Sequence, residues 1–227
     1  MKNKSYIGIS FIILIFGILV IPKIIDRAKG GDILDDNRLN KVKGKKSDLV
    51  SFAKAPEFSF INEEGEKIPS DFYRDKVYLV EFFFTTCPTI CPKMNENMKK
   101  LDSVFGNRRD FGIASITINP NVDTPEVLKA YKKRYGITNT NWNFLTGDQD
   151  VIFDLAKKFE VYVGENADVA GGFEHSGLFA LMDKEGVIRS RKDQFENPIL
   201  YYRGVKEGES EAQVMELIKD IEKLLKE

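Results

Sequence analysis

The sequence predicts an α/β layer fold with a mixed central sheet flanked by helices. Segments with the pattern of strands alternate with segments of helical periodicity, and the series of strands ends in an antiparallel hairpin. With 227 residues, 42% of them hydrophobic, the chain is long enough for one ordinary domain plus a short appendage. Its net charge of −1, with acidic and basic residues interleaved, disfavours binding to nucleic acid.

The first predicted element is a membrane anchor over residues 1–25. Residues 6–21 carry no charge, and a helix that extends to residue 25 is about 30 Å long, which matches the hydrocarbon core of a bilayer. No small-residue cleavage site follows, so an uncleaved transmembrane helix is preferred to a signal peptide. We expect a single-pass protein of the inner (cytoplasmic) membrane with its soluble domain on the periplasmic side, where thiol chemistry is favoured.

A polar, charged stretch over residues 26–54 is predicted to be a flexible tether, and the folded domain is expected to occupy 55–227. The domain begins with an N-terminal β-hairpin, two short alternating segments around residues 64–65. Residues 76–84, KVYLVEFFF, are nearly all apolar, which is typical of a strand buried on both faces. Apolar residues at helical spacing then predict a helix over 93–105.

The same alternation continues to the end of the chain, with two further strand and helix pairs, a hairpin and a final amphipathic helix. Strands joined through helices lie parallel, whereas a hairpin is antiparallel, so the sheet is expected to be mixed. The predicted ranges are 111–118 and 124–135 for the first pair, 141–147 and 148–159 for the second, 177–191 for the hairpin and 209–225 for the helix.

The only two cysteines, Cys87 and Cys91, follow the buried strand directly, in the stretch TTCPTICPKM. If a helix begins near Cys87, the i, i+4 spacing places both sulfurs on one face, where they can hold one metal ion. The first turn of a helix also favours the thiolate, which binds metals and attacks disulfides. The stretch therefore indicates a redox couple or a metal clamp. A structural disulfide or a pair of packed small residues is the remaining alternative.

His175, the single histidine, lies at the end of a Gly-rich loop just before a predicted strand. One histidine and two cysteines cannot complete a Cys₄ or Cys₂His₂ zinc site. Two thiolates and one imidazole favour copper, as Cu(I) or as Cu(II) with an added ligand, and catalytic zinc with a bound water is the formal alternative. Such a histidine taken alone is more often a surface or packing residue, so its metal role depends on its reaching the cysteines.

Three stretches together resemble the Sco/SenC family of membrane-anchored, thioredoxin-fold copper proteins: FFFTTCPTICPKM, INPNVDTPEVLKAY and EHSGLFALMDKEG. The resemblance covers about residues 56–191 and the C-terminal helix, with the stretches in the family's order. It implies a thioredoxin-like fold and a copper chaperone and thiol-disulfide protein that helps to assemble the binuclear copper site of cytochrome c oxidase.

The resemblance also implies the residues of the site. Asp123 matches an aspartate that lies near the family's metal, although by itself it is typical of a residue beside a helix N-cap. Glu174 stands where the family usually has Asp, and Asn119 replaces another common aspartate; both are expected to alter the charge around the metal. The residues that match the family's ligands for one copper per chain are Cys87, Cys91 and His175.

The leading functional hypothesis is a copper-binding assembly factor rather than an enzyme with turnover. Its partner would be the copper-bearing subunit of cytochrome c oxidase or another copper-receiving protein. The alternative is an enzyme, a thiol-disulfide oxidoreductase acting on partner cysteines; such enzymes of this fold usually carry C-x-x-C and have no use for His175. A peroxidase of the peroxiredoxin kind is disfavoured because its T-x-x-C arrangement is absent. No role is assigned to residues 193–209.

Overall fold

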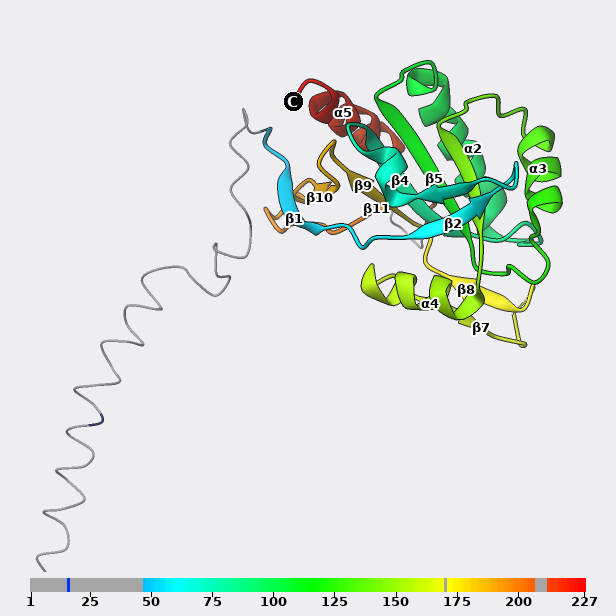
Figure 1. Cartoon of the computed structure of the whole chain (residues 1–227). Helices are drawn as coiled ribbons and strands as arrows, with labels where there is room; N and C mark the ends of the chain where they lie inside the picture. The colour runs from blue at the N-terminus through cyan, green and yellow to red at the C-terminus, as the bar shows by residue number, and fades with distance from the viewer. Residues whose placement is uncertain (1–15, 17–46, 170, 207–211) are drawn as a thin grey trace, which may run out of the picture. The chain divides into compact units, whose positions relative to one another are not determined.

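The computed structural model describes residues 16, 47–169, 171–206 and 212–227. The chain divides into two compact units, Met1–Val42 and Lys43–Glu227. The second unit is an α/β fold built around a nine-stranded mixed sheet (Figure 1). The strands of this sheet, in spatial order, are β1 (Val50–Lys54), β10 (Val187–Ser190), β9 (Leu178–Met182), β4 (Val77–Phe83), β5 (Phe111–Thr117), β6 (Trp142–Thr146), β2 (Ser59–Asn62) and β3 (Lys67–Pro69), and β11 (Tyr202–Arg203) also pairs with β9.

Within residues 47–169, 171–206 and 212–227, the helical elements are the 3₁₀ helix η1 (Ser70–Tyr73), α2 (Ile90–Phe105), α3 (Pro125–Arg134), α4 (Gln149–Lys158) and α5 (Val214–Leu225). The ring of Phe82 packs against Phe159 at the end of α4, and that of Phe83 packs against Tyr131 of α3. Successive side chains of a strand point to opposite faces, so α3 and α4 cover opposite faces of the sheet.

Strand β4 lies at the centre of the sheet, and every one of its residues is buried. It pairs in parallel with β5 and antiparallel with β9, and β5 pairs in parallel with β6. The predicted mixed sheet is therefore confirmed. A parallel strand covered on both faces needs a nearly continuous apolar sequence, which explains why KVYLVEFFF was recognisable as a central strand.

The two predicted hairpins are confirmed as the antiparallel pairs β2 with β3 and β9 with β10. The helices predicted at 124–135 and 148–159 correspond to α3 and α4, and side chains of Thr124 and Asp148 cap their N-termini. Helix α2 begins at Ile90, three residues before its predicted start. The strands that were not predicted are short or lie in polar sequence: β1, β11, β7 (Val163–Glu165) and β8 (Phe173–His175).

Strands β7 and β8 form a two-stranded antiparallel sheet of their own, in which Val163 is the partner of His175. We call residues 163–169 and 171–175 the histidine hairpin. In Figure 1 this hairpin lies beside α4. Gln149, the first residue of α4, donates a hydrogen bond to the carboxylate of Glu165 in β7 at 2.7 Å. The hairpin thus stands outside the hydrogen-bond ladder of the main sheet.

Strand β1 falls in the segment predicted to be a tether, and it pairs with β10. The domain boundary at residue 55 stays a prediction. The predicted localisation, a single-pass inner-membrane protein, is corrected: within the part of the chain that the structure describes, no helix is long and apolar enough to cross a bilayer. Apart from Phe16, the residues of the predicted anchor, 1–25, lie outside the described ones.

Candidate metal centre

Cys87 lies in the turn that follows β4, and Cys91 lies in the first turn of α2. Cys87 therefore precedes the helix and does not share a face with Cys91. The reason is Pro88, because the residue before a proline disfavours the helical conformation. Pro92 is tolerated in the first helical turn, where backbone N–H groups have no partner within the helix. The turn folds back so that the Cys91 N–H donates to the Cys87 Sγ at 3.5 Å.

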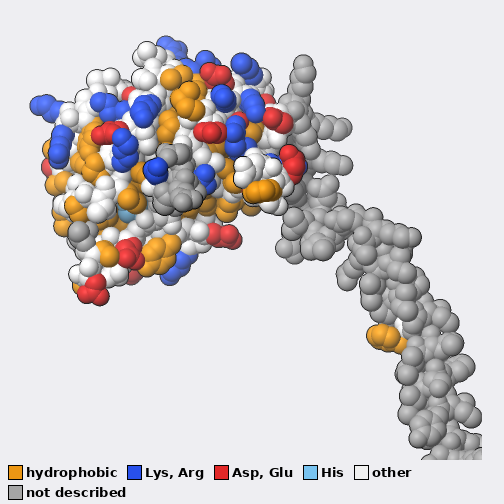
Figure 2. All heavy atoms as spheres, turned by 180° about the vertical axis from the view of Figure 1, so that it is seen from behind, with side chains coloured by type: hydrophobic (Ala, Val, Ile, Leu, Met, Phe, Trp, Pro, Cys, Tyr) orange, Lys and Arg blue, Asp and Glu red, His pale blue; other side chains and the backbone are white. Residues whose placement is uncertain are grey.

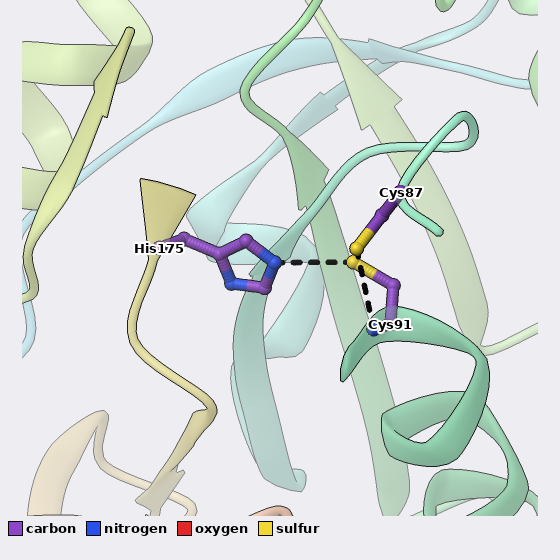
Figure 3. A group of neighbouring side chains, drawn as sticks. All are labelled: Cys87, Cys91 and His175. Atoms are coloured by element: carbon purple, nitrogen blue, oxygen red, sulfur yellow. Dashed lines mark hydrogen bonds between the residues drawn. The ribbon is translucent and has the colours of Figure 1, made fainter. Parts of the chain in front are cut away.

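The structure brings His175 to this pair of sulfurs (Figure 3). Its Nε2 is 3.1 Å from the Cys91 Sγ, and the three candidate ligand atoms of Cys87, Cys91 and His175 all lie within 4.8 Å of one another. In Figure 3 the imidazole points at the sulfurs from the histidine hairpin, across from the turn and helix that carry the cysteines. Side chains that are 84 residues apart in sequence thus converge on one point.

The imidazole is oriented by its other nitrogen. His175 Nδ1 is 3.2 Å from the carbonyl oxygen of Ser176. A carbonyl oxygen only accepts, so Nδ1 carries a proton and donates to it, which leaves Nε2 as the ring nitrogen that faces the cysteines. This is the arrangement in which a histidine binds a metal ion through Nε2.

Phe84 connects the histidine hairpin to the cysteine turn. Its ring lies 5.6 Å from the ring of Phe173 and 5.9 Å from that of His175, centroid to centroid. Gly171 comes so close that a Cβ there would lie 2.9 Å from the Phe84 ring and 3.1 Å from Pro88. Its φ of +94° is also one that other residues rarely adopt. Close approach of the hairpin to the turn therefore depends on glycine at this position.

The side chains of Cys87 and Cys91 differ in how readily they lose a proton. Side-chain hydrogen bonds from Cys91 and, less strongly, from His175 lower the pKa of Cys87 to about 3, against the opposing effect of burial. The hydrogen bond between the two cysteines, together with burial, raises the pKa of Cys91. Cys87 is 8% exposed and Cys91 is fully buried. At neutral pH the pair accordingly carries a thiolate on Cys87 and a proton on Cys91, which metal binding or oxidation must remove.

Asp123 is fully buried at the carboxyl ends of β4 and β5. Its carboxylate accepts the N–H of Thr85 at 3.0 Å, the hydroxyl of Thr85, and the hydroxyl of Thr117 at 2.5 Å. Thr124, not Asp123, caps α3. Asp123 thus fixes the backbone two residues before Cys87. Its predicted influence on the metal stays a prediction. The hydrogen bonds to Thr85 are the contacts through which Asp123 would act on the cysteine turn.

Glu174 lies next to His175 on β8, where alternation turns the two side chains to opposite sides. Its carboxylate accepts from Asn166 at 2.9 Å and from Tyr162 at 3.4 Å, within the histidine hairpin and its approach. Asn119 accepts the backbone N–H of Asp123 at 2.9 Å through its own carbonyl. The structure therefore gives Glu174 and Asn119 contacts that shape the segments around the site. Their predicted effect on its charge stays a prediction.

The site lies close to the surface of the domain. The side chain of His175 is half-buried, and histidine atoms, coloured pale blue, are visible on the face shown in Figure 2. Thr89, close to the Cys87 sulfur, is exposed. Sequence reasoning missed Thr89 and the Thr85 and Thr117 partners of Asp123. The signal for Thr89 was its place in the N-cap position of a helix that begins at Ile90.

The fold and the site together define a class of protein, namely a thioredoxin-like domain with a Cys-Cys-His centre at the end of a central strand. The model of the SCO1/SenC family matches residues 47–208. The chain belongs to this family, as the sequence analysis predicted. The thioredoxin-like fold predicted for it is confirmed as well.

Relatives and solved structures agree with this assignment. An SCO2-like protein of Rickettsia prowazekii is 35% identical over 57% of this chain and 64% of its own length, and the SCO1 protein homolog of Bacillus subtilis is 30% identical over 62% and 74%. BsSco, described as a Sco-family cytochrome c oxidase assembly protein with a disulfide switch, has a TM-score of 0.63 and 25% identity over 80% and 98% of the two chains.

ScoI of Arabidopsis thaliana with copper bound has a TM-score of 0.56 and 24% identity over 77% of this chain and 99% of its own, a likeness that shows the fold. This chain thus spans less than two thirds of the Rickettsia relative's length but nearly all of the chains in the two solved structures.

Proposed function

We propose that the protein binds one copper ion through Cys87, Cys91 and His175 and delivers it to a copper-receiving protein. The observation that carries the proposal is the convergence of two sulfurs and one imidazole nitrogen within 4.8 Å. Two soft thiolates and an imidazole suit copper, and the described residues contribute no carboxylate to this cluster. Copper is the cargo, and its release to the partner completes the reaction.

The proposed recipient is the copper-bearing subunit of cytochrome c oxidase. Family membership supports this, as does the description of BsSco as an assembly protein of that oxidase. We further propose that the redox state of the cysteines controls loading, because a Cys87–Cys91 disulfide has no thiolate to offer a metal. Equal copper uptake by the fully reduced and the fully oxidised protein would contradict this control.

A second candidate function is thiol-disulfide exchange with the partner's cysteines, without obligatory metal. The favouring observation is the hydrogen bond that stabilises a Cys87 thiolate beside a protonated Cys91. In this reaction the Cys87 thiolate attacks a partner disulfide and releases one partner thiolate. Cys91 then loses its proton to solvent, attacks the Cys87 sulfur and releases the second partner thiolate. The partner gains two thiols, and a Cys87–Cys91 disulfide forms.

His175→Ala separates the two functions. We expect this variant to lose tight Cu(I) binding, by at least about a hundredfold, and the Cu(II)–thiolate charge-transfer band, because one of the three donors is gone. Its disulfide exchange with a model disulfide peptide should stay within a few-fold of wild type. Cys91→Ser, the control, should lose both activities. A His175→Ala variant that holds one copper per chain with wild-type affinity would show that the three-ligand site is wrong.

A further inference from the structure

The segment between β10 and β11 presents an aromatic ring to solvent. Phe195 is 73% exposed, the highest value among the large hydrophobic side chains of the described residues. Single exposed apolar residues are common on soluble proteins, so exposure alone does not indicate a function. What distinguishes Phe195 is the structure of the segment that carries it, residues 192–198, which we call the phenylalanine loop.

The tip of the phenylalanine loop is ordered by one carboxylate. Asp193 Oδ1 accepts the backbone N–H groups of Phe195 at 2.8 Å and of Asn197 at 2.9 Å. The backbone of Asp193 also donates to the Asn197 carbonyl at 2.8 Å and accepts the Glu196 N–H at 3.1 Å. Glu196 has a φ of +65°, which a residue other than glycine adopts only where its surroundings require it. The backbone on both sides of Phe195 is therefore held in one conformation.

The root of the loop is fixed to the core of the domain. Lys192 and Pro198 form an antiparallel β-bridge across its neck. The Arg191 guanidinium donates to both oxygens of Asp220 in α5, at 2.7 Å and 3.1 Å. Asp220 is fully buried and also accepts the hydroxyl of Tyr202 in β11 at 2.9 Å. The ring of the loop thus projects from a segment whose two ends are bound to buried groups.

An ordered loop with an exposed ring has the properties of an anchor for another protein. Burial of a phenylalanine ring is favourable, so a ring held in water forgoes a stabilisation that it can regain on contact with a partner. Aromatic residues, phenylalanine included, are enriched at protein interfaces. A loop that is ordered before binding also lowers the entropic cost of association.

The phenylalanine loop lies at the end of the sheet that carries the metal centre. Strand β10 is antiparallel to β9, which is antiparallel to β4, so β10 and β4 run in the same direction and finish at the same end of the sheet. The cysteine turn follows β4, and the loop follows β10. The chain then returns through β11, where Gly204 donates its N–H to the Gly177 carbonyl at 2.7 Å, close to His175. Figure 1 draws this return in orange.

We propose that the phenylalanine loop docks the protein that receives the copper, with the Phe195 ring inserted into an apolar pocket of that protein. This inference rests on the proposed function. Copper passes between ligands that are in contact, so the recipient has to cover the end of the domain at which Cys87 and His175 lie. A standard protein interface covers about 800 Å² on each partner, far more than a three-ligand site, so it extends over neighbouring features of that end.

The contact that the loop offers is apolar rather than charged. Lys192 and Glu196 pair with each other at 3.1 Å, and the Asp193 carboxylate accepts two backbone N–H groups of the loop itself. The recipient therefore has to supply an apolar surface at this point. The contribution of Phe195 to binding should accordingly change little with salt concentration.

Phe195→Ala removes the anchor and leaves the metal ligands in place. The full chain, reduced and metal-free, is titrated by calorimetry with the soluble domain of the copper-bearing subunit of cytochrome c oxidase, the proposed recipient. We expect the dissociation constant to rise about tenfold in Phe195→Ala. Val104→Ala is the matched control, because Val104 is 50% exposed and lies near the C-terminal end of α2, about 20 Å along the helix from Cys91. The control should bind within about twofold of wild type.

Two further measurements separate docking from metal binding. Phe195→Ala should bind Cu(I) with wild-type affinity. Its rate of copper transfer should fall about tenfold at low recipient concentration and equal that of wild type at saturation. Asp193→Ala keeps the ring but removes the acceptor that orders the loop, so it should also weaken docking, by about threefold.

Unchanged affinity in Phe195→Ala, or an equal loss in Val104→Ala, would overturn the inference. So would a wild-type chain that does not bind the recipient domain. Loss of self-association in Phe195→Ala, with unchanged affinity for that domain, would assign the ring to a contact between copies of this chain and overturn the inference as well. A wild-type chain that binds the domain through Phe195 but keeps its copper would uphold the docking inference and contradict the proposed function.

Discussion

The two halves of the candidate metal centre are held by different kinds of structure. Cys87 and Cys91 follow β4, a fully buried strand at the centre of the nine-stranded sheet, and Cys91 itself is fully buried. His175 lies on the histidine hairpin, a two-stranded sheet of its own with half-buried or exposed residues. The cysteine half is thus fixed by the core of the domain, and the histidine half by local contacts.

This difference suits the proposed function, in which the protein must both hold and release a metal ion. Elements with few buried apolar contacts open at lower free-energy cost than a central strand does. The histidine hairpin can therefore separate from the cysteines without unfolding of the sheet. Changes in the cysteine half should then alter global stability, and changes in the hairpin should alter copper affinity alone.

Asp123→Ala is expected to give the largest effect, because it acts on the cysteine half. The substitution leaves the backbone and hydroxyl donors of Thr85 and the hydroxyl of Thr117 without their acceptor in a buried site. We expect a loss of about 3 kcal/mol in the free energy of unfolding, measured by urea denaturation. Glu174→Ala in the hairpin is the control and should cost less than about 1 kcal/mol. Equal losses in the two variants would refute the proposed division.

Glu81 makes the stability of the cysteine half depend on pH. Burial raises the pKa of this β4 carboxyl to about 7 from 4.5, against a hydrogen bond from Ser115. The folded state therefore binds more protons than the unfolded state between these two pKa values, so stability falls as pH rises through that window. We expect the stability of wild type relative to Glu81→Gln to decrease by about 2 kcal/mol from pH 5 to pH 8; the comparison with the variant cancels the contribution of Cys87, whose lowered pKa acts with the opposite sign in both proteins.

Urea titrations of wild type and Glu81→Gln at both pH values provide the comparison. The opposite sign, with wild type gaining stability relative to Glu81→Gln as pH rises, would mean that the Glu81 carboxyl is ionised in the folded protein.

Gly171→Ala should give the smallest effect and confine it to the hairpin. A Cβ at Gly171 meets Phe84 and Pro88, whereas one at Gly172 meets nothing within 4 Å, although both glycines have positive φ. The matched pair therefore separates steric contact from backbone strain. We expect Gly171→Ala to bind Cu(I) about tenfold more weakly than Gly172→Ala, because His175 is displaced, with equal urea midpoints. Competition titration against a Cu(I) chelator checks this, and equal affinities would argue against the contact.

The same division explains what the sequence could predict. Strand β4 and the helices α3 and α4 have continuous apolar runs or helical periodicity, and the sequence predicted them within one residue of their ends in the structure. The strands of the histidine hairpin have three residues each, too few to show a period, and their pairing depends on Gly171 and Gly172 in the connecting loop. His175 was found by its rarity and its family motif, not by local structure.

The sequence alone could not predict the start of α2 or the contacts of Thr89, for a related reason. Spacing alone placed both cysteines on one helical face, but Pro88 delays the helix until Ile90 and leaves Cys87 in the turn. The two sulfurs still meet, through a hydrogen bond to the Cys91 backbone that no periodicity encodes. The pairing of the cysteines was thus predictable, whereas their inequality required the three-dimensional contacts.

The central claim is that the two halves meet on one copper ion, and ligand counting by copper K-edge X-ray absorption tests it most directly. The copper-loaded reduced protein and its His175→Ala variant are compared under anaerobic conditions. We predict two sulfur ligands and one imidazole nitrogen in wild type, with the nitrogen contribution lost in His175→Ala and both sulfurs retained. A wild-type spectrum without imidazole scattering, or one unchanged by His175→Ala, would contradict the account.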